Sequence, residues 1–172
     1  MERIWIAIGS NFGKPLKQVN TALSELAKLP KTRFLACSSY YRSRPLGLQN
    51  QPDFLNAVAV LDTALTPEIL LNYIQAIELK QGRVRKANRF GPRTLDLDIL
   101  LFGMRTIVTP RLTIPHYDIY NREFFLYPLK ELSPNLQFPN GVMLSYYLTQ
   151  VPYNNLTYWN EDLSITTHIP IR

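Results

Sequence analysis

Hydrophobic positions near the N-terminus follow two different patterns in turn, and each pattern predicts one element. Residues 4–8 form a continuous apolar run that ends in Gly9-Ser10-Asn11, which predicts a buried strand followed by a turn. Pro15 then opens a segment in which leucine and valine recur at helical spacing as far as Pro30. Because proline suits the first turn of a helix and stops its interior, this segment predicts a helix.

The same analysis predicts three more strands and a second helix before residue 103. Residues 34–41 are rich in aromatic and small side chains, and residues 54–61 contain β-branched valines, so both segments predict strands. Thr66-Pro67 supplies an N-cap and a first-turn proline for a helix that continues to Gly82. Residues 95–102 predict the last strand of the series.

The predicted order is strand, helix, strand, strand, helix, strand. This order matches the ferredoxin-like arrangement, an α+β fold in which an antiparallel sheet carries its helices on one face. Two short helices near residues 121–126 and 143–148 would follow as C-terminal additions.

Composition sets the broad class of the protein. The 172 residues, 46% of them hydrophobic, predict one domain over residues 1–150 and a tail, residues 151–172, that is partly docked or disordered. Cys37 is the single cysteine, which excludes an intramolecular disulfide and predicts a small buried residue. The first apolar run is too short for a secretion signal and no segment approaches the length of a membrane span, so we expect a soluble cytoplasmic protein.

Asp96 and Asp98 are the strongest candidates for chemistry. Side chains two apart on a strand share a face, so the two carboxylates would be neighbours, while Leu95, Leu97, Ile99 and Leu101 would face the core. Two unit charges about 4 Å apart repel by roughly 4 kcal/mol at an effective dielectric near 20, and a divalent cation would remove this penalty. Because cysteine and histidine are scarce, the hard cation Mg²⁺ fits better than a transition metal.

Basic residues precede the aspartates. Six cations and no acid lie in the fourteen residues from Lys80 to Arg93, and the chain carries a net charge of +6. A local cluster of this kind beside a carboxylate pair suits a polyphosphate such as ATP better than a long polyanion.

Donors and aromatic rings that could complete a site lie on both sides of this region. Arg111, Thr113, His116 and Arg122 place several donors in a short span. Phe54 and Phe124 could hold a flat ring between them, and Asn56 would share a strand face with Phe54.

Each of these features has an ordinary structural explanation that the residues alone leave open. The aspartates could form a solvated strand face, the arginines a solvated loop, His116 a surface residue, and the phenylalanines part of the core. Residues 9–15 imitate a phosphate-binding loop, but the glycines are too close together and Pro15 stands where Ser or Thr is needed. We interpret Gly9 and Asn11 as turn formers, and His168 as a surface residue.

The chain resembles the 6-hydroxymethyl-7,8-dihydropterin pyrophosphokinase family of folate biosynthesis. The most specific match is Gly91-Pro92-Arg93-Thr94-Leu95-Asp96-Leu97-Asp98. Further matching blocks follow the family order from about residue 4 to residue 140, namely 4–11, 44–47, 51–56, 81–86, 89–98, 114–118 and 121–122.

The resemblance implies a transferase that moves a pyrophosphoryl group from ATP to the hydroxymethyl group of the pterin and releases AMP. It implies four catalytic residues, namely Arg83, Arg93, Asp96 and Asp98. The aspartates would bind two Mg²⁺, and the arginines would contact the phosphates. The ATP site would be lined by Gln75, Glu78, Arg85, Arg93, Ile99, Arg111, Thr113, His116, Tyr117 and Arg122. The pterin site would be formed by Ser43, Leu46, Gly47, Phe54, Asn56, Phe90 and Phe124.

Phe54 and Phe90 depart from the family, in which tyrosine and tryptophan are usual. Stacking survives both changes, but a hydroxyl and an indole N–H are lost. We expect a monomer without nucleic-acid or membrane partners. One alternative is a non-catalytic RNA-binding ferredoxin-like module, although residues 54–60 lack its aromatic motif. The other is a nucleotidyltransferase, in which a Gly-Ser pair comes shortly before the aspartates, although Gly9-Ser10 precedes Asp96 by more than eighty positions in this sequence.

Overall fold

The computed structural model describes residues 1–44, 51–82, 94–153 and 156–159. Its elements in chain order are β1 (Glu2–Ser10), α1 (Pro15–Ala27), β2 (Thr32–Cys37), β3 (Tyr41–Ser43), β4 (Phe54–Thr63), α2 (Pro67–Lys80), β5 (Asp96–Phe102), β6 (Ile107–Val108), β7 (Thr113–Ile114), α3 (Glu123–Leu132), α4 (Leu144–Gln150) and β8 (Thr157–Tyr158).

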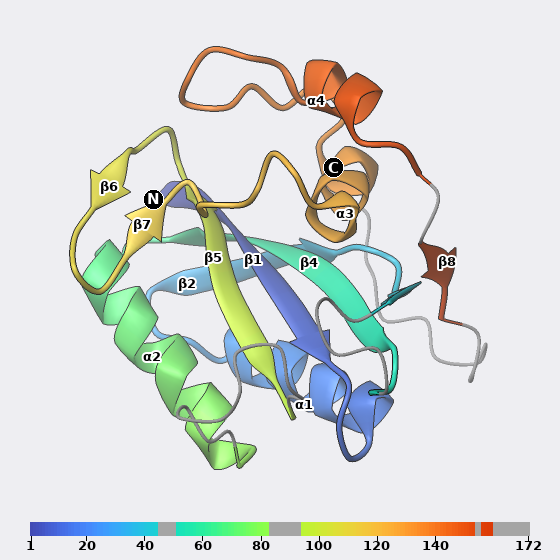
Figure 1. Ribbon diagram of the computed structural model, residues 1–172. Coiled ribbons are helices and arrows are strands. Elements are labelled where there is room, and N and C mark those ends of the chain that lie inside the picture. The colour runs from blue at the N-terminus through green and yellow to red at the C-terminus, as the bar shows by residue number, and fades with distance from the viewer. Residues whose placement is uncertain (45–50, 83–93, 154–155, 160–172) are drawn as a thin grey trace.

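The main sheet is antiparallel, and β1 and β4 are its inner long strands (Figure 1). β1 pairs with β4 on one side and with β5 on the other, and β2 and β3 both pair with β4. This order, β5-β1-β4 followed by β2, is the ferredoxin-like arrangement, so the predicted fold class is confirmed.

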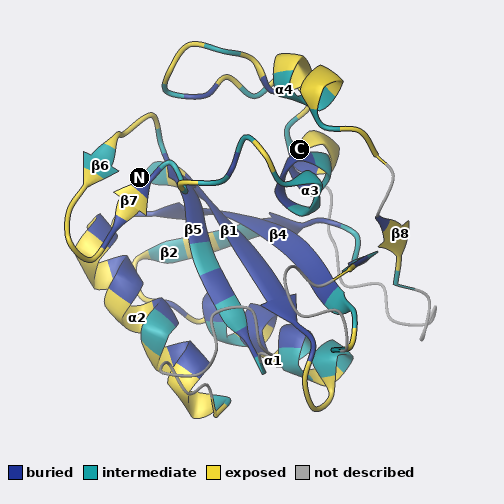
Figure 2. Ribbon diagram, in the orientation of Figure 1, coloured by how far each residue is buried: buried dark blue, intermediate teal, exposed yellow. Residues whose placement is uncertain are grey.

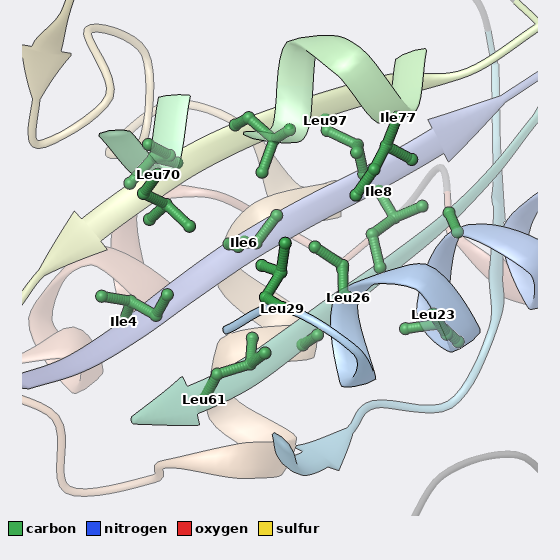
Figure 3. Close-up of a cluster of buried hydrophobic side chains, with 14 of the residues drawn as sticks. Ile4, Ile6, Ile8, Leu23, Leu26, Leu29, Leu61, Leu70, Ile77 and Leu97 are labelled. Atoms are coloured by element: carbon green, nitrogen blue, oxygen red, sulfur yellow. The ribbon is translucent and has the colours of Figure 1, made fainter. Parts of the chain in front are cut away.

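Two hydrophobic cores lie on opposite faces of this sheet. Ile4, Ile6 and Ile8 of β1 pack under α1 and α2, where Figure 3 shows them meeting Leu26 and Leu70. The alternate residues of β1 and β4 face α3 instead and form a second core. Because both faces are covered, the central strands are buried along most of their length (Figure 2). The predicted helices therefore share one face, and the C-terminal helix α3 covers the other.

The strand predicted over residues 34–41 is two strands, which corrects that prediction. The break lies at Ser38, whose backbone N–H donates to Val58 O at 2.8 Å while its Oγ accepts from Val58 N at 3.0 Å. The side-chain oxygen thus takes the place of a ladder carbonyl and ends the regular pairing. β2 pairs with the far half of β4 and β3 with its beginning.

The face predicted for Leu101 is also wrong. The pairing between β1 and β5 shifts register, so that Trp5 lies opposite Leu101 while Ile6 lies opposite Ile99. The extra residue is a bulge, which reverses the alternation of side chains beyond it. Leu101 consequently packs in the α3 core, whereas Leu97 and Ile99 pack under α1 and α2 as predicted.

The C-terminal residues that the structure describes return to the sheet. β8 pairs with β3, and the backbone N–H of Trp159 donates to Tyr40 O at 2.9 Å. The Arg42 guanidinium lies 4.1 Å from the centre of the Trp159 ring, within the range of a cation–π contact.

Two smaller predictions concern Cys37 and membrane spans. Cys37 is buried as predicted, and burial raises the pKa of its thiol. Within the described parts of the chain, no helix combines the length and apolar character that crossing a membrane requires.

Candidate active site

The pairing of β4, β1 and β5 brings three site positions into one row. Gly9 of β1 lies opposite Asn56 of β4 on one side and opposite Asp96 of β5 on the other. With strands about 4.8 Å apart, the amide and the carboxylate are separated at the backbone by roughly 10 Å. Gly9 has no side chain, and a Cβ placed there would lie 3.5 Å from Asn56 Oδ1. The Asn56 carbonyl oxygen therefore faces Gly9, and the Phe54 ring lies 3.8 Å from the same Cβ position.

Asp96 and Asp98 point to the α3 side of the sheet. They alternate with Leu97 and Ile99, which are buried under α1 and α2. The Asp98 side chain is 47% exposed, so it remains accessible to a ligand. Within the described residues, no three histidine, cysteine or acidic side chains gather as a metal cluster. A pair of carboxylates is nevertheless a donor set that suits Mg²⁺, which completes its shell with water and phosphate oxygens.

A cavity of about 300 Å³ lies along the outer edge of β5, between α2 and residues 109–117. This volume is at the lower end of the range for small-molecule sites. It brings together most of the residues predicted for the ATP site, together with one of the aspartates: Gln75, Glu78, Asp98, Ile99, Arg111, Thr113, His116 and Tyr117.

Arg122 is the described ATP-site candidate that does not line this cavity. It precedes α3, and its guanidinium forms an ion pair with Asp118. Asp118 also accepts a hydrogen bond from Asn121 Nδ2 at 3.0 Å. The carboxylate of Asp118 therefore fixes Arg122 beside the cavity rather than in its wall.

His116 is held as a neutral imidazole. Its Nδ1 accepts a hydrogen bond from the backbone N–H of Asp118 at 3.1 Å, so the ring proton resides on Nε2. Burial lowers the pKa of His116 to about 4; the Asp118 charge opposes this shift and the Arg122 charge adds to it. The ring stacks on Tyr117 and meets the edge of Phe125. The result is a fixed N–H donor in the cavity wall.

Glu78 connects α2 to the strand that carries the aspartates. Its carboxylate is buried and accepts a hydrogen bond from the backbone N–H of Leu97 at 2.8 Å. Leu97 lies between Asp96 and Asp98, so this contact holds the backbone of both.

Arg111 is oriented by side chains of α2. Its guanidinium donates to Glu68 at 3.0 Å, to Asn72 at 2.7 Å and to Gln75 at 3.4 Å. The charge is half exposed at the rim of the cavity, where it can meet an anionic ligand.

The pterin-site candidates lie on β3, β4 and α3. Asn56 Nδ2 donates to Ser43 Oγ at 2.5 Å, which orients the Asn56 amide with its oxygen toward Gly9. Phe54 is partly buried at the start of β4, and Phe124 is partly buried in the first turn of α3, edge-on to Phe125. Six predicted residues lie outside the described parts of the chain, namely Leu46, Gly47, Arg83, Arg85, Phe90 and Arg93, as does His168.

Sequence reasoning missed the residues that support these groups. Asp118, Glu68 and Asn72 act through partners that are themselves site candidates, and Gln18 connects segments far apart in the chain. Of these residues, only Asp118 could have been found from the sequence, because it lies in the block of residues 114–118 that matches the family.

The fold and these groups define an α+β enzyme in which a donor-lined cavity adjoins a pair of carboxylates. The family model for 7,8-dihydro-6-hydroxymethylpterin-pyrophosphokinase (HPPK) matches residues 5–134. The chain belongs to this family, and membership does not favour the RNA-binding or nucleotidyltransferase alternatives.

Similar proteins cover almost the whole chain. The 2-amino-4-hydroxy-6-hydroxymethyldihydropteridine pyrophosphokinase of Pseudomonas aeruginosa is 49% identical over 156 residues, which are 91% of this chain and 96% of that protein. The protein of the same name from Haemophilus influenzae is 49% identical over 146 residues, 85% of this chain and 91% of that protein.

A solved structure supports the fold. The crystal structure of wild-type Plasmodium falciparum HPPK-DHPS with SDX-DHP matches with a TM-score of 0.65 at 13% identity. The match covers 87% of this chain and 43% of that longer chain. At this identity it shows a shared fold.

Proposed function

We propose that the protein transfers a pyrophosphoryl group from ATP to the hydroxymethyl oxygen of 6-hydroxymethyl-7,8-dihydropterin. The hydroxymethyl oxygen forms a bond to the β-phosphorus, and the bond from that phosphorus to the α,β-bridging oxygen breaks. AMP leaves with the bridging oxygen, and the hydroxyl proton is released to solvent. The family match over residues 5–134 carries this proposal.

The geometry supports the proposal because the residues proposed for the pterin lie next to the residues proposed for the nucleotide. The row Asn56, Gly9 and Asp96 runs from the pterin candidates to the carboxylates, and Asp98 is shared with the cavity beside α2. A pterin over Gly9 and a nucleotide along β5 would therefore meet at the aspartates. Holding two reactants in line in this way supplies much of the rate acceleration in phosphoryl transfer.

The described residues have distinct tasks toward the nucleotide. His116 would donate its Nε2 proton in a hydrogen bond to an oxygen of ATP, because its low pKa and its Nδ1 partner keep it in that tautomer. Arg111 would contribute a fixed positive charge at the rim. Glu78 holds the β5 backbone in place.

Asp96 and Asp98 would hold two Mg²⁺. Bound there, the cations would neutralise charge on the phosphate oxygens. Arg83, Arg85 and Arg93, which lie outside the described residues, are proposed from the family resemblance to contact the phosphates as well. Together these groups match the high negative charge of a polyphosphate.

The pterin would lie between Phe54 and Phe124, with Phe90 and backbone groups of Leu46 and Gly47 completing its site. Asn56 Oδ1 faces Gly9 and would accept from an N–H group of the heterocycle. We propose that the protein acts as a monomer whose catalytic domain spans residues 1–150.

The direct test is to incubate the protein with ATP, Mg²⁺ and 6-hydroxymethyl-7,8-dihydropterin and to separate the nucleotides. We expect AMP and pterin diphosphate in equal amounts, and no AMP when the pterin is omitted. ADP as the only product, or no product, would overturn the proposal. Tight binding of an oligoribonucleotide without turnover would support the RNA-binding alternative instead.

A further inference from the structure

Gln18 of α1 is the centre of a hydrogen-bond network outside the cavity. Its Nε2 lies 2.8 Å from Ser10 Oγ, 2.7 Å from Phe12 O and 2.7 Å from Thr94 O. Its Oε1 accepts from the backbone N–H of Lys14 at 3.1 Å. One amide therefore closes the turn after β1 and binds it to the residue that enters β5.

The same residue also contacts the end of α2. Gln81, which caps that helix, donates from its Nε2 to the backbone oxygen of Gln18 at 3.1 Å. Gln81 and Thr94 lie on either side of residues 83–93, which are outside the described parts of the chain. Gln18 thus contacts the described chain on both sides of these residues, Thr94 through its side chain and Gln81 through its backbone.

Thr94 is fixed especially firmly. Its carbonyl accepts from Ser10 Oγ at 2.6 Å as well as from Gln18 Nε2. Ser10 is fully buried, and Thr94 lies two residues before Asp96. Two peptide units therefore separate the carbonyl that Gln18 holds from the first carboxylate of the pair.

We propose that Gln18 is a positioning residue for the reaction, setting the entry of β5 and thereby the place of Asp96. The inference rests on the proposed function for its kinetic consequence, although its structural consequence can be measured independently. Gln18 does not line the cavity, so its effect would be on geometry rather than on binding. A displacement of about 1 Å in a phosphoryl-transfer site can reduce turnover about a hundredfold.

Two substitutions separate the donor function of Gln18 from its shape. Gln18→Met keeps the length of the side chain and removes its polar groups, and we expect kcat to fall at least about tenfold with the KM for the pterin within about twofold. Gln18→Glu replaces the donor with an oxygen that faces two carbonyls, at Phe12 and Thr94. Partial burial beside two carbonyl oxygens disfavours the ionised form and raises the pKa of a carboxyl at this position. We therefore expect a larger loss at pH 8 than at pH 6, because more of the carboxyl is protonated at pH 6 and can again donate one hydrogen bond.

Gln150 provides a matched control. It lies at the end of α4, is exposed, and donates to Thr149 Oγ1 at 3.0 Å. Gln150→Met and Gln150→Glu repeat the same chemical changes away from the site, and their kcat, KM and pH profile should match those of the unaltered protein. A Gln18 variant with normal kcat and normal pH profile would overturn the inference while leaving the proposed function intact.

Hydrogen exchange supplies a readout that does not need activity. In Gln18→Met, the peptide that contains residues 94–98 should exchange at least about tenfold faster, while peptides from β4 and α4 keep their rates. Unchanged exchange at residues 94–98 would overturn the inference even if the protein produced no AMP. Ser10→Ala, which removes the second donor to Thr94, should accelerate exchange in the same peptide and serves if Gln18→Met fails to fold.

Discussion

His116 Nε2 lies 4.0 Å from Asp98 Oδ1, across the boundary between the cavity and the carboxylate pair. The other ring nitrogen is occupied by the backbone N–H of Asp118. His116 therefore presents its single proton on the side of the aspartates, where a polyphosphate would lie. Because the ring is buried and neutral, it can donate to an anion without adding a charge that changes with pH near neutrality.

The low pKa of His116 predicts a dependence of stability on pH. In the folded protein this pKa is about 4, against 6.5 in the unfolded chain. Between these values the unfolded chain binds a proton that the folded protein does not, so the free energy of unfolding decreases as pH falls. The loss from this residue should approach about 3 kcal/mol by pH 4. Urea unfolding at pH 7, 5.5 and 4, in metal-free buffer, measures it.

The variant His116→Gln should lose less stability over the same interval, because it has no group that titrates there. His168→Gln is the control and should keep the pH dependence of the unaltered protein. Equal slopes in the His116 variant and the unaltered protein would show that burial does not lower this pKa.

The main features of the fold could be predicted from the sequence because they depend on local signals. The apolar run at residues 4–8, the first-turn prolines Pro15 and Pro67, and the strand at residues 95–102 all indicate elements from neighbouring residues alone. The order of these elements, strand, helix, strand, strand, helix, strand, then predicts the ferredoxin-like sheet.

The corrections arise where a distant residue decides the local structure. The break at Ser38 depends on its contacts with Val58, and the bulge in β5 depends on the register of β1. Similarly, Gln18 becomes important only because the fold brings the Thr94 carbonyl, 76 positions away, within hydrogen-bond distance of its side chain. The spacing of hydrophobic residues along the chain cannot predict such contacts, because they join residues that are far apart in the sequence.

Replacing Asp98 by alanine should remove most Mg²⁺-dependent turnover without unfolding the protein. The side chain is about half exposed, so its loss leaves no core cavity. If the carboxylate holds a cation that neutralises the phosphates, kcat should fall by at least about a hundredfold. Steady-state rates over a Mg²⁺ titration measure the effect, and Glu2→Gln, a change in a surface ion pair with Arg105, is the control. A near-normal rate for Asp98→Ala would contradict the metal assignment.

Replacing Asn56 by alanine should weaken pterin binding specifically. Loss of one buried hydrogen-bonding group costs about 1 to 3 kcal/mol, so the KM for the pterin should rise roughly ten- to a hundredfold with little change for ATP. Ser43→Ala tests whether Ser43 Oγ acts by orienting the amide. If it does, adding this change to Asn56→Ala should have little further effect on KM. Additive losses would instead show that the Ser43 hydroxyl contacts the pterin independently.

Replacing Glu78 by alanine should reduce both stability and turnover. The change leaves the buried N–H of Leu97 without its acceptor, which costs about 1 to 3 kcal/mol, and it frees the backbone between Asp96 and Asp98. Glu78→Gln retains an oxygen that can accept the same hydrogen bond, so it should recover most of the stability. Thermal unfolding and kcat for the two variants are compared with those for Glu25→Ala, which removes an acid that pairs with Lys80 at the surface and should cost at most about 1 kcal/mol. Equal losses in the alanine and glutamine variants would show that the Glu78 charge, rather than its hydrogen bond to Leu97, is what the site requires.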